Sequence, residues 1–297
     1  MLAIDDPSSA DSRLPQMPDL RSTAGAIVPE AVERTGLDPA VPGTPPAEPR
    51  RWWGRHLAEV RWQAELARLV VDPVYRGAGV PHGDGGPVVL VPGFLAGDVS
   101  LGVMQDWLER IGYRAYGSGI VANVDCSDRA LNRLEVRVEN VQASAGRKVA
   151  LIGHSRGGHF AKALAHRRPD LVAGVVSLGA GLDTPFDISV PTKAAVAAVR
   201  AVQGRLRPEL ARTGCLTEAC GCAFARDYAA PFPAEIPLTS VYSREDGVVW
   251  WEACTVPYAR NVEVTGSHVG LAFNRKVYRV LGEALAAMDQ ATVPALA

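Results

Sequence analysis

The sequence predicts an α/β fold with a mostly parallel central sheet and helices on both of its faces. Two observations predict this fold. From residue 87 onward, short apolar runs alternate with longer segments whose apolar residues recur at helical spacing. The polar residues that could carry chemistry follow the apolar runs, as they do in parallel sheets. The chain has 297 residues, enough for one large domain with a substantial core.

The N-terminal part of the chain differs in composition from the rest. Residues 1–48 are rich in Pro, Ala, Ser, Asp and Glu, which predicts a disordered tail. We expect residues 49–86 to form a helical segment packed on the core. Within this segment, residues 50–71 have a helical pattern whose predicted apolar face comprises Trp53, Leu57, Val60, Ala64, Ala67 and Val71. Peripheral contact of this face with lipid stays an alternative.

Residues 87–297 are predicted to form the main domain. Its strands are expected at residues 87–91, 113–121, 148–152, 171–178, 237–243 and 261–264. Its helices are expected at residues 98–111, 127–145 and 158–166. Ligands of such sheets bind beyond the carboxyl ends of the strands. We therefore expect the functional side chains to gather at one edge of the sheet.

A long insertion, at about residues 182–236, separates two of these strands. It contains an apolar helix at residues 193–202. Long insertions in compact domains are commonly lids or binding loops. Because this one starts and ends where ligands bind, we expect a helical cap over the site, with an ordinary packing subdomain as the alternative.

The insertion also holds a cluster of cysteines: Cys215, Cys220 and Cys222. A zinc site needs a fourth ligand and no histidine lies nearby in sequence, so we expect no metal. The total of five cysteines is odd, which argues against a complete disulfide framework. A local disulfide within the cluster and three free thiols remain as alternatives.

The charge balance excludes several classes of partner. The chain has 31 basic and 32 acidic residues without a basic stripe, so we expect no nucleic-acid partner. No apolar run is long enough to span a bilayer. The first residues lack the basic and apolar regions of a signal peptide, which predicts a cytoplasmic location, with non-classical export as an alternative.

Ser155 is the predicted nucleophile. Residues 153–157 read Gly-His-Ser-Arg-Gly and lie between a predicted strand and a predicted helix. The pattern Gly-x-Ser-x-Gly in this setting places a serine on a tight, strained turn, and the flanking glycines let strand and helix pass closely. A serine hydroxyl needs a base to take its proton and a third group to orient that base.

His268 is the predicted base. Only three histidines follow Ser155, and His159 and His166 lie on the helix that starts at the serine, where we expect them not to reach back over it. His268 lies in a glycine-containing loop after a predicted strand. Such a loop can bring an imidazole over the serine.

Asp246 is our first choice for the group that orients His268. It follows the strand predicted at residues 237–243 and lies between Ser155 and His268 in the sequence. Its neighbour Glu245 and the earlier Asp183 remain alternatives. A buried carboxylate bonded to one imidazole nitrogen would select the tautomer and stabilise the imidazolium.

The backbone N–H groups of Phe94 and Arg156 are the predicted donors to a developing oxyanion. Arg156 starts the helix after the serine, and Phe94 follows the first strand, with Leu95 as its alternative. The Phe94 ring either lines an acyl pocket or only packs. We expect the Arg156 guanidinium to form a structural ion pair and His154 to be held by packing.

Residues 87–285 resemble the α/β-hydrolase superfamily, and within it the bacterial lipase and esterase branch. The resemblance is carried by residues 88–94, 153–158, 243–247 and 266–271, although family members often have His-Gly where this chain has Pro92-Gly93. It implies hydrolysis of carboxylic esters with a hydrophobic acyl chain, through an acyl-enzyme and without metal or organic cofactor. Acyl transfer or thioester cleavage by the same residues is an alternative, and non-catalytic ligand binding is a further one.

Overall fold

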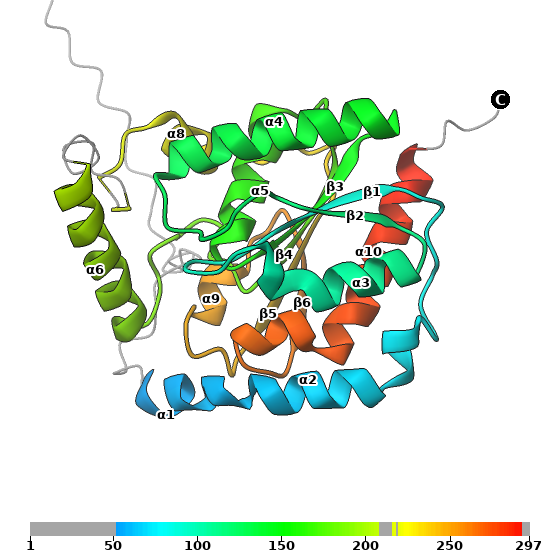
Figure 1. The fold of residues 1–297 in the computed structure, drawn as a ribbon, viewed down its shortest axis with the longest axis horizontal. Coiled ribbons are helices and arrows are strands. Elements are labelled where there is room, and N and C mark those ends of the chain that lie inside the picture. Colours follow the sequence, from blue (N-terminus) through cyan, green and yellow to red (C-terminus); the bar gives the residue numbers. More distant parts are fainter. Residues whose placement is uncertain (1–51, 208–215, 218, 293–297) are drawn as a thin grey trace, which may run out of the picture. The chain divides into compact units, whose positions relative to one another are not determined.

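The computed structural model describes residues 52–207, 216–217 and 219–292. The tail predicted at residues 1–48 lies outside these residues, as does Cys215. Figure 1 shows the fold with the labels used below.

Six parallel strands form the central sheet, in the order β2-β1-β3-β4-β5-β6. The strands are β1 (Pro87–Val91), β2 (Arg114–Gly117), β3 (Val149–His154), β4 (Val172–Leu178), β5 (Leu238–Ser243) and β6 (Arg260–Val264). Strand β2 is shorter than the sequence predicted. The Asp98 carboxylate accepts hydrogen bonds from the backbone N–H groups of Ser118 (3.1 Å) and Gly119 (2.7 Å), so the chain turns away from the sheet there.

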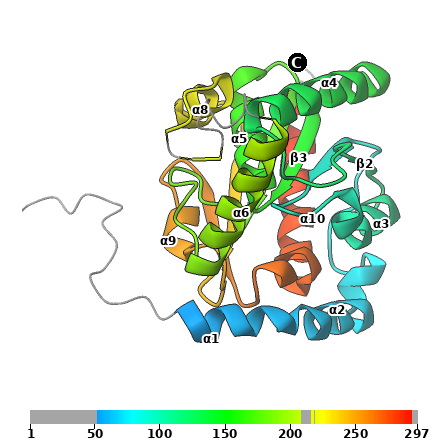
Figure 2. The same ribbon diagram turned by 60° about the vertical axis from the view of Figure 1, so that its left-hand side comes forward.

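Helices cover both faces of the sheet, which confirms the predicted fold class (Figure 1, Figure 2). Helices α3 (Gly102–Arg110), preceded by the 3₁₀ turn η3 (Asp98–Leu101), and α10 (Arg275–Thr292) pack on one face. Helices α4 (Ser127–Ala145), α5 (Arg156–Arg167) and α8 (Ala223–Ala229) pack on the other. Strand β1 shows why both faces are needed: Val88 and Leu90 join one core while Val89 and Val91 join the other.

The N-terminal segment consists of α1 (Trp52–Leu57), the 3₁₀ turn η1 (Ala58–Arg61) and α2 (Trp62–Val71), followed by η2 (Pro73–Arg76). Its Leu69 is fully buried in the core beneath α10. The apolar face predicted from the sequence does not pack on the core, because Leu57, Val60 and Val71 are each at least 70% exposed. The opposite face packs on the loops at the end of the sheet, and its polar side chains bond to loop backbone there.

The insertion contains α6 (Val190–Leu206) and α8 (Ala223–Ala229). Helix α8 lies against α4 and α5, whereas α6 has no buried residue and stands at the left of Figure 1. The short helix α9 (Trp251–Cys254) follows β5, and the 3₁₀ turn η4 (Val269–Phe273) follows β6. None of the helices described here has both the length and the apolar character that crossing a membrane requires.

Candidate active site

Ser155 lies on a strained turn between β3 and α5. Its backbone has φ of 53° and ψ of −124°, a region that residues with a side chain rarely adopt. A side chain at Gly153 would run into the backbone of Gly157, and one at Gly157 would run into the Val91 carbonyl. The two glycines are therefore required where strand and helix pass each other.

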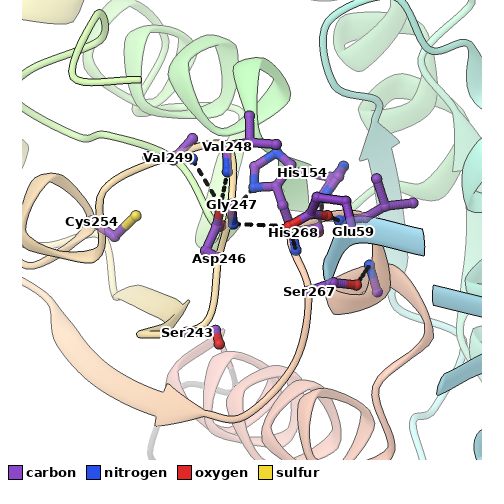
Figure 3. A network of polar contacts seen from close by, with 12 residues as sticks. Glu59, His154, Ser243, Asp246, Gly247, Val248, Val249, Cys254, Ser267 and His268 are labelled. Atoms are coloured by element: carbon purple, nitrogen blue, oxygen red, sulfur yellow. Dashed lines mark hydrogen bonds and ion pairs between the residues drawn. The ribbon is translucent and has the colours of Figure 1, made fainter. Parts of the chain in front are cut away.

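Asp246 is the carboxylate bonded to His268. Its Oδ2 lies 2.6 Å from His268 Nδ1, and both side chains are buried (Figure 3). The backbone N–H groups of Val248 and Val249 each donate to Asp246 Oδ1 at 2.8 Å. These bonds orient the carboxylate toward the ring, which selects the tautomer with hydrogen on Nδ1 and leaves Nε2 as the base.

The two alternative acids are used elsewhere. Glu245 accepts from Arg61 Nη2 at 2.8 Å on the surface. Asp183 accepts from Lys162 Nζ at 2.9 Å and from the Tyr258 hydroxyl at 2.5 Å. Neither carboxylate contacts His268 in the described part of the chain.

The surroundings of His268 favour its protonated form. Burial opposes protonation, but the charge and hydrogen bond of Asp246, together with the charge of Glu59, outweigh it and raise the pKa of His268 above its ordinary value. The raised pKa makes this imidazole a stronger base and stabilises the imidazolium that forms when it takes a proton.

A cavity of about 1270 Å³ opens beside these residues, and Ser155, His268, Phe94 and Arg156 all border it. No hydrogen bond joins Ser155 to His268 in the described residues; in a site without substrate such contacts are often loose. Most of the other lining residues are apolar, among them Leu95, Phe186, Ile188, Ala195, Val196, Leu216, Phe224, Phe232 and Val249.

The loop after β1 borders this cavity with Phe94 and Leu95, whose backbone N–H groups differ in their partners. The N–H group of Leu95 donates to the Asn123 carbonyl at 3.3 Å, so it is already engaged. Within the described residues, the N–H group of Phe94 has no hydrogen-bond partner. The geometry therefore favours Phe94 over Leu95 as the oxyanion donor of this loop.

The Arg156 side chain holds the loop after β2 instead of facing substrate. Its guanidinium donates to the backbone and side-chain oxygens of Asn123 (both 2.9 Å), to the Asp125 carbonyl (2.8 Å) and to the Ser127 hydroxyl (3.0 Å). The Asn123 amide in turn donates to the Pro92 carbonyl at 2.7 Å. Sequence reasoning missed Asn123, which links the loop after β1 to the residue after Ser155.

His154 supports the histidine loop. Its Nε2 donates to the His268 carbonyl at 2.9 Å, and the two rings lie 4.9 Å apart. Burial and the nearby His268 lower the pKa of His154 to about 4, so it is neutral at neutral pH. Its role in the structure is that of a buried hydrogen-bond donor.

Helix α5 adds two further polar residues to the cavity wall that sequence reasoning did not place there, His159 and Lys162. They lie four and seven residues after Ser155, on the same face of the helix, and this spacing was the available signal. Burial and the charges of Arg156 and Lys162 lower the pKa of His159 to about 3. The buried Lys162 donates to the Leu182 carbonyl at 2.7 Å as well as to Asp183.

The N-terminal segment contributes two carboxylates that sequence reasoning also missed. Glu59 accepts hydrogen bonds from the backbone of the loops that carry Asp246 and His268 (Figure 3). Glu65 accepts from the backbone N–H (2.9 Å) and the hydroxyl (2.7 Å) of Ser267. Helices outside residues 87–285 therefore contact the candidate site directly.

One cysteine of the cluster borders the cavity. The Sγ atoms of Cys220 and Cys222 are 3.2 Å apart, both as free thiols, and Cys220 borders the cavity. Within the described ranges, no group of three or more His, Cys, Asp or Glu side chains is arranged to hold a metal ion.

The sequence of this chain is similar to a family model and to a known lipase. The family model described as alpha/beta hydrolase fold matches residues 86–220. A triacylglycerol lipase from Vibrio cholerae is 38% identical over 99 residues, which cover 31% of this chain and 31% of that protein. The match thus spans about a third of the length of that relative.

A solved structure shows the same fold. A soluble variant of monoglyceride lipase from Saccharomyces cerevisiae superimposes with a TM-score of 0.51 at 14% identity, covering 72% of this chain and 91% of that one. A monoacylglycerol lipase from Paleococcus ferrophilus gives a TM-score of 0.49 at 18% identity, covering 69% and 96%. The chain therefore has the alpha/beta hydrolase fold, and a triacylglycerol lipase is among the proteins that it resembles in sequence.

Proposed function

We propose that this protein is a serine hydrolase that cleaves carboxylic esters, as an esterase or lipase. The main support is one juxtaposition: Ser155 on its strained turn and His268, held by Asp246, border the same apolar cavity. A nucleophile, a base and a buried orienting acid are the three parts that acyl transfer to serine requires.

The proposed reaction has two halves. In the first, Ser155 Oγ attacks the ester carbonyl while His268 Nε2 takes its proton, and Asp246 stabilises the imidazolium. The N–H groups of Phe94 and Arg156 bind the oxyanion. The imidazolium then protonates the leaving alcohol, which departs and leaves an acyl-serine. In the second half, His268 deprotonates a water that attacks the acyl-serine, and the acid is released with Ser155 restored.

The shape of the cavity supports an ester with a hydrophobic acyl chain. Its volume of about 1270 Å³ exceeds the roughly 300–1000 Å³ typical of small-ligand pockets, and its lining is mostly apolar. Helix α6 supplies Pro191, Ala195 and Val196 to the wall, as a cap over the site would. The relatives named as triacylglycerol and monoglyceride lipases agree with such a substrate.

Turnover of p-nitrophenyl esters of increasing acyl length, together with labelling by a fluorophosphonate, tests this proposal. We expect the wild-type protein to be labelled and to hydrolyse these esters, and Ser155→Ala to lose labelling and at least about a thousandfold in kcat/KM. Ser177→Ala, a buried serine on β4, is the matched control and should keep both. A wild-type protein that is neither labelled nor active on any acyl ester would refute the proposal. Product analysis with a competing alcohol separates hydrolysis from acyl transfer.

A further inference from the structure

The Glu59 carboxylate joins two loops that the fold brings together at the end of the sheet. Its Oε1 accepts from the N–H groups of Gly247 and His268, each at 2.9 Å, and its Oε2 accepts from Val269 at 3.0 Å. Gly247 directly follows Asp246, so one side chain from η1 holds the backbone on both sides of the Asp246–His268 hydrogen bond (Figure 3). Charge-assisted bonds to backbone N–H groups are among the strongest that a carboxylate makes.

The same segment holds both loops at further points. Arg61 pairs with Glu245, the neighbour of Asp246, and His56 Nδ1 lies 3.4 Å from the Gly247 carbonyl. Glu65 binds Ser267, the residue before His268. The N-terminal segment therefore contacts the backbone immediately next to each member of the pair.

Two glycines show how closely the N-terminal segment approaches the loops that carry Asp246 and His268. A side chain at Gly247 would run into the backbone of Arg55, and one at Gly270 would run into the Glu65 carboxylate. Neither glycine has a positive φ, so turn geometry does not require them. Because they lack side chains, they instead leave room for the N-terminal segment. The sequences of the Asp246 and His268 loops are therefore compatible with its docking.

We propose that Glu59 is a positioning residue of the active site, which ties the Asp246 loop to the His268 loop through hydrogen bonds to the backbone of both. Its part in turnover rests on the proposed function, whereas its effect on His268 does not. Among the residues that the structure describes, the ionisable groups that face His268 are Asp246 from the loop after β5, His154 from the end of β3 and Glu59 from η1. Glu65 instead accepts a hydrogen bond from Ser267, the residue before His268.

The sign of the effect on His268 follows from this arrangement. Burial lowers the pKa of His268, and the charges of Asp246 and Glu59 raise it. Removing the Glu59 charge should lower this pKa, so the acid limb of kcat/KM should move to lower pH. Less support for the imidazolium and a looser His268 loop should also lower kcat, while KM changes little because Glu59 does not border the cavity.

The test uses the full chain with Glu59→Gln and Glu59→Asp, and Glu65→Gln as the matched carboxylate control. Two measurements are made: the pH profile of kcat/KM on p-nitrophenyl butyrate, and an NMR titration of ¹³C-labelled histidines with His268 assigned through His268→Gln. For Glu59→Gln we expect a His268 pKa lower by roughly 0.5 to 1 unit, from a unit charge several ångströms away, and a kcat about tenfold lower. Glu65→Gln should leave the pKa of His268 in place.

Each result decides the proposal. A folded Glu59→Gln protein with a wild-type kcat and an unmoved His268 titration overturns it. If Glu59→Gln does not fold, Glu59→Asp decides: it keeps the charge but is too short to span both loops, so the acid limb should stay while kcat falls. A wild-type kcat in Glu59→Asp then overturns it. If the wild-type protein hydrolyses no ester, the proposed function fails, yet the NMR titration still tests the action of Glu59 on His268.

Discussion

Replacing Asn123 with alanine should lower catalysis without touching any group that reacts. Asn123 is 1% exposed, and its side chain joins the Pro92 carbonyl to the Arg156 guanidinium. The first partner begins the loop that carries the Phe94 N–H group, and the second follows Ser155. Both proposed oxyanion donors are therefore oriented through one buried amide.

The size of the effect can be worked out from the lost bonds. Asn123→Ala removes the bond to the Pro92 carbonyl, while Arg156 Nη1 keeps its bond to the backbone carbonyl of residue 123. A buried polar group left unpaired costs about 1–3 kcal/mol, so we expect a loss of about 1–3 kcal/mol in the free energy of unfolding. Loosening a donor costs less than the 10²–10³ of removing one, so kcat should fall roughly tenfold.

Urea unfolding and steady-state kinetics on p-nitrophenyl butyrate measure the two effects separately. Asn132→Ala is the matched control, because Asn132 accepts from Arg167 on the surface and should lose less than about 0.5 kcal/mol with kcat unchanged. If Asn123→Ala loses stability but keeps the wild-type kcat, the amide does not orient the oxyanion donors and the reasoning is wrong.

Two other predictions concern stability. In the folded protein the pKa of His154 is about 4 against an ordinary 6.5, so the unfolded chain binds its proton first and stability is lost as pH falls from about 6.5 toward 4. Between pH 7 and pH 5 this group should cost about 2 kcal/mol, which His154→Gln should remove in urea unfolding at the two pH values. Gly270→Ala should cost about 1–3 kcal/mol because its methyl group meets the Glu65 carboxylate. Adding Glu65→Ala should recover part of that loss, and a Gly270→Ala protein with wild-type stability would contradict the close docking of α2.

Most of the sheet was predictable because its signals are local. Runs such as residues 148–152 and 171–178 are apolar and bounded by turns, and each corresponds to a strand of the structure to within two residues. The helix predicted at residues 127–145 matches α4. Strand β2 was overestimated because its end is set by the distant Asp98 carboxylate rather than by its own sequence.

The candidate site was predictable where a motif fixes the geometry. The Gly-x-Ser-x-Gly pattern requires the strained turn found at Ser155, and chain order pointed to Asp246 and His268, which are hydrogen-bonded in the structure. Asn123 and Glu59 could not be found in this way. Each acts on backbone groups that are distant in the sequence, and an isolated Asn or Glu has no pattern to distinguish it from a solvated surface residue.

The mixed docking face of the N-terminal segment explains why its predicted orientation differs from the structure. Amphipathic reasoning assigns the apolar stripe to the core because a core offers apolar partners. Here the surface to be covered is a set of loops at the end of a parallel sheet, which present backbone N–H groups. Glu59 and Glu65 satisfy these donors. The buried Leu69 and the Trp62 ring, which lies 5.7 Å from that of Phe273, also turn inward, and Leu57 and Val60 are left outside. The segment thus buries a mixed face, on which apolar side chains meet the core and carboxylates meet backbone N–H groups.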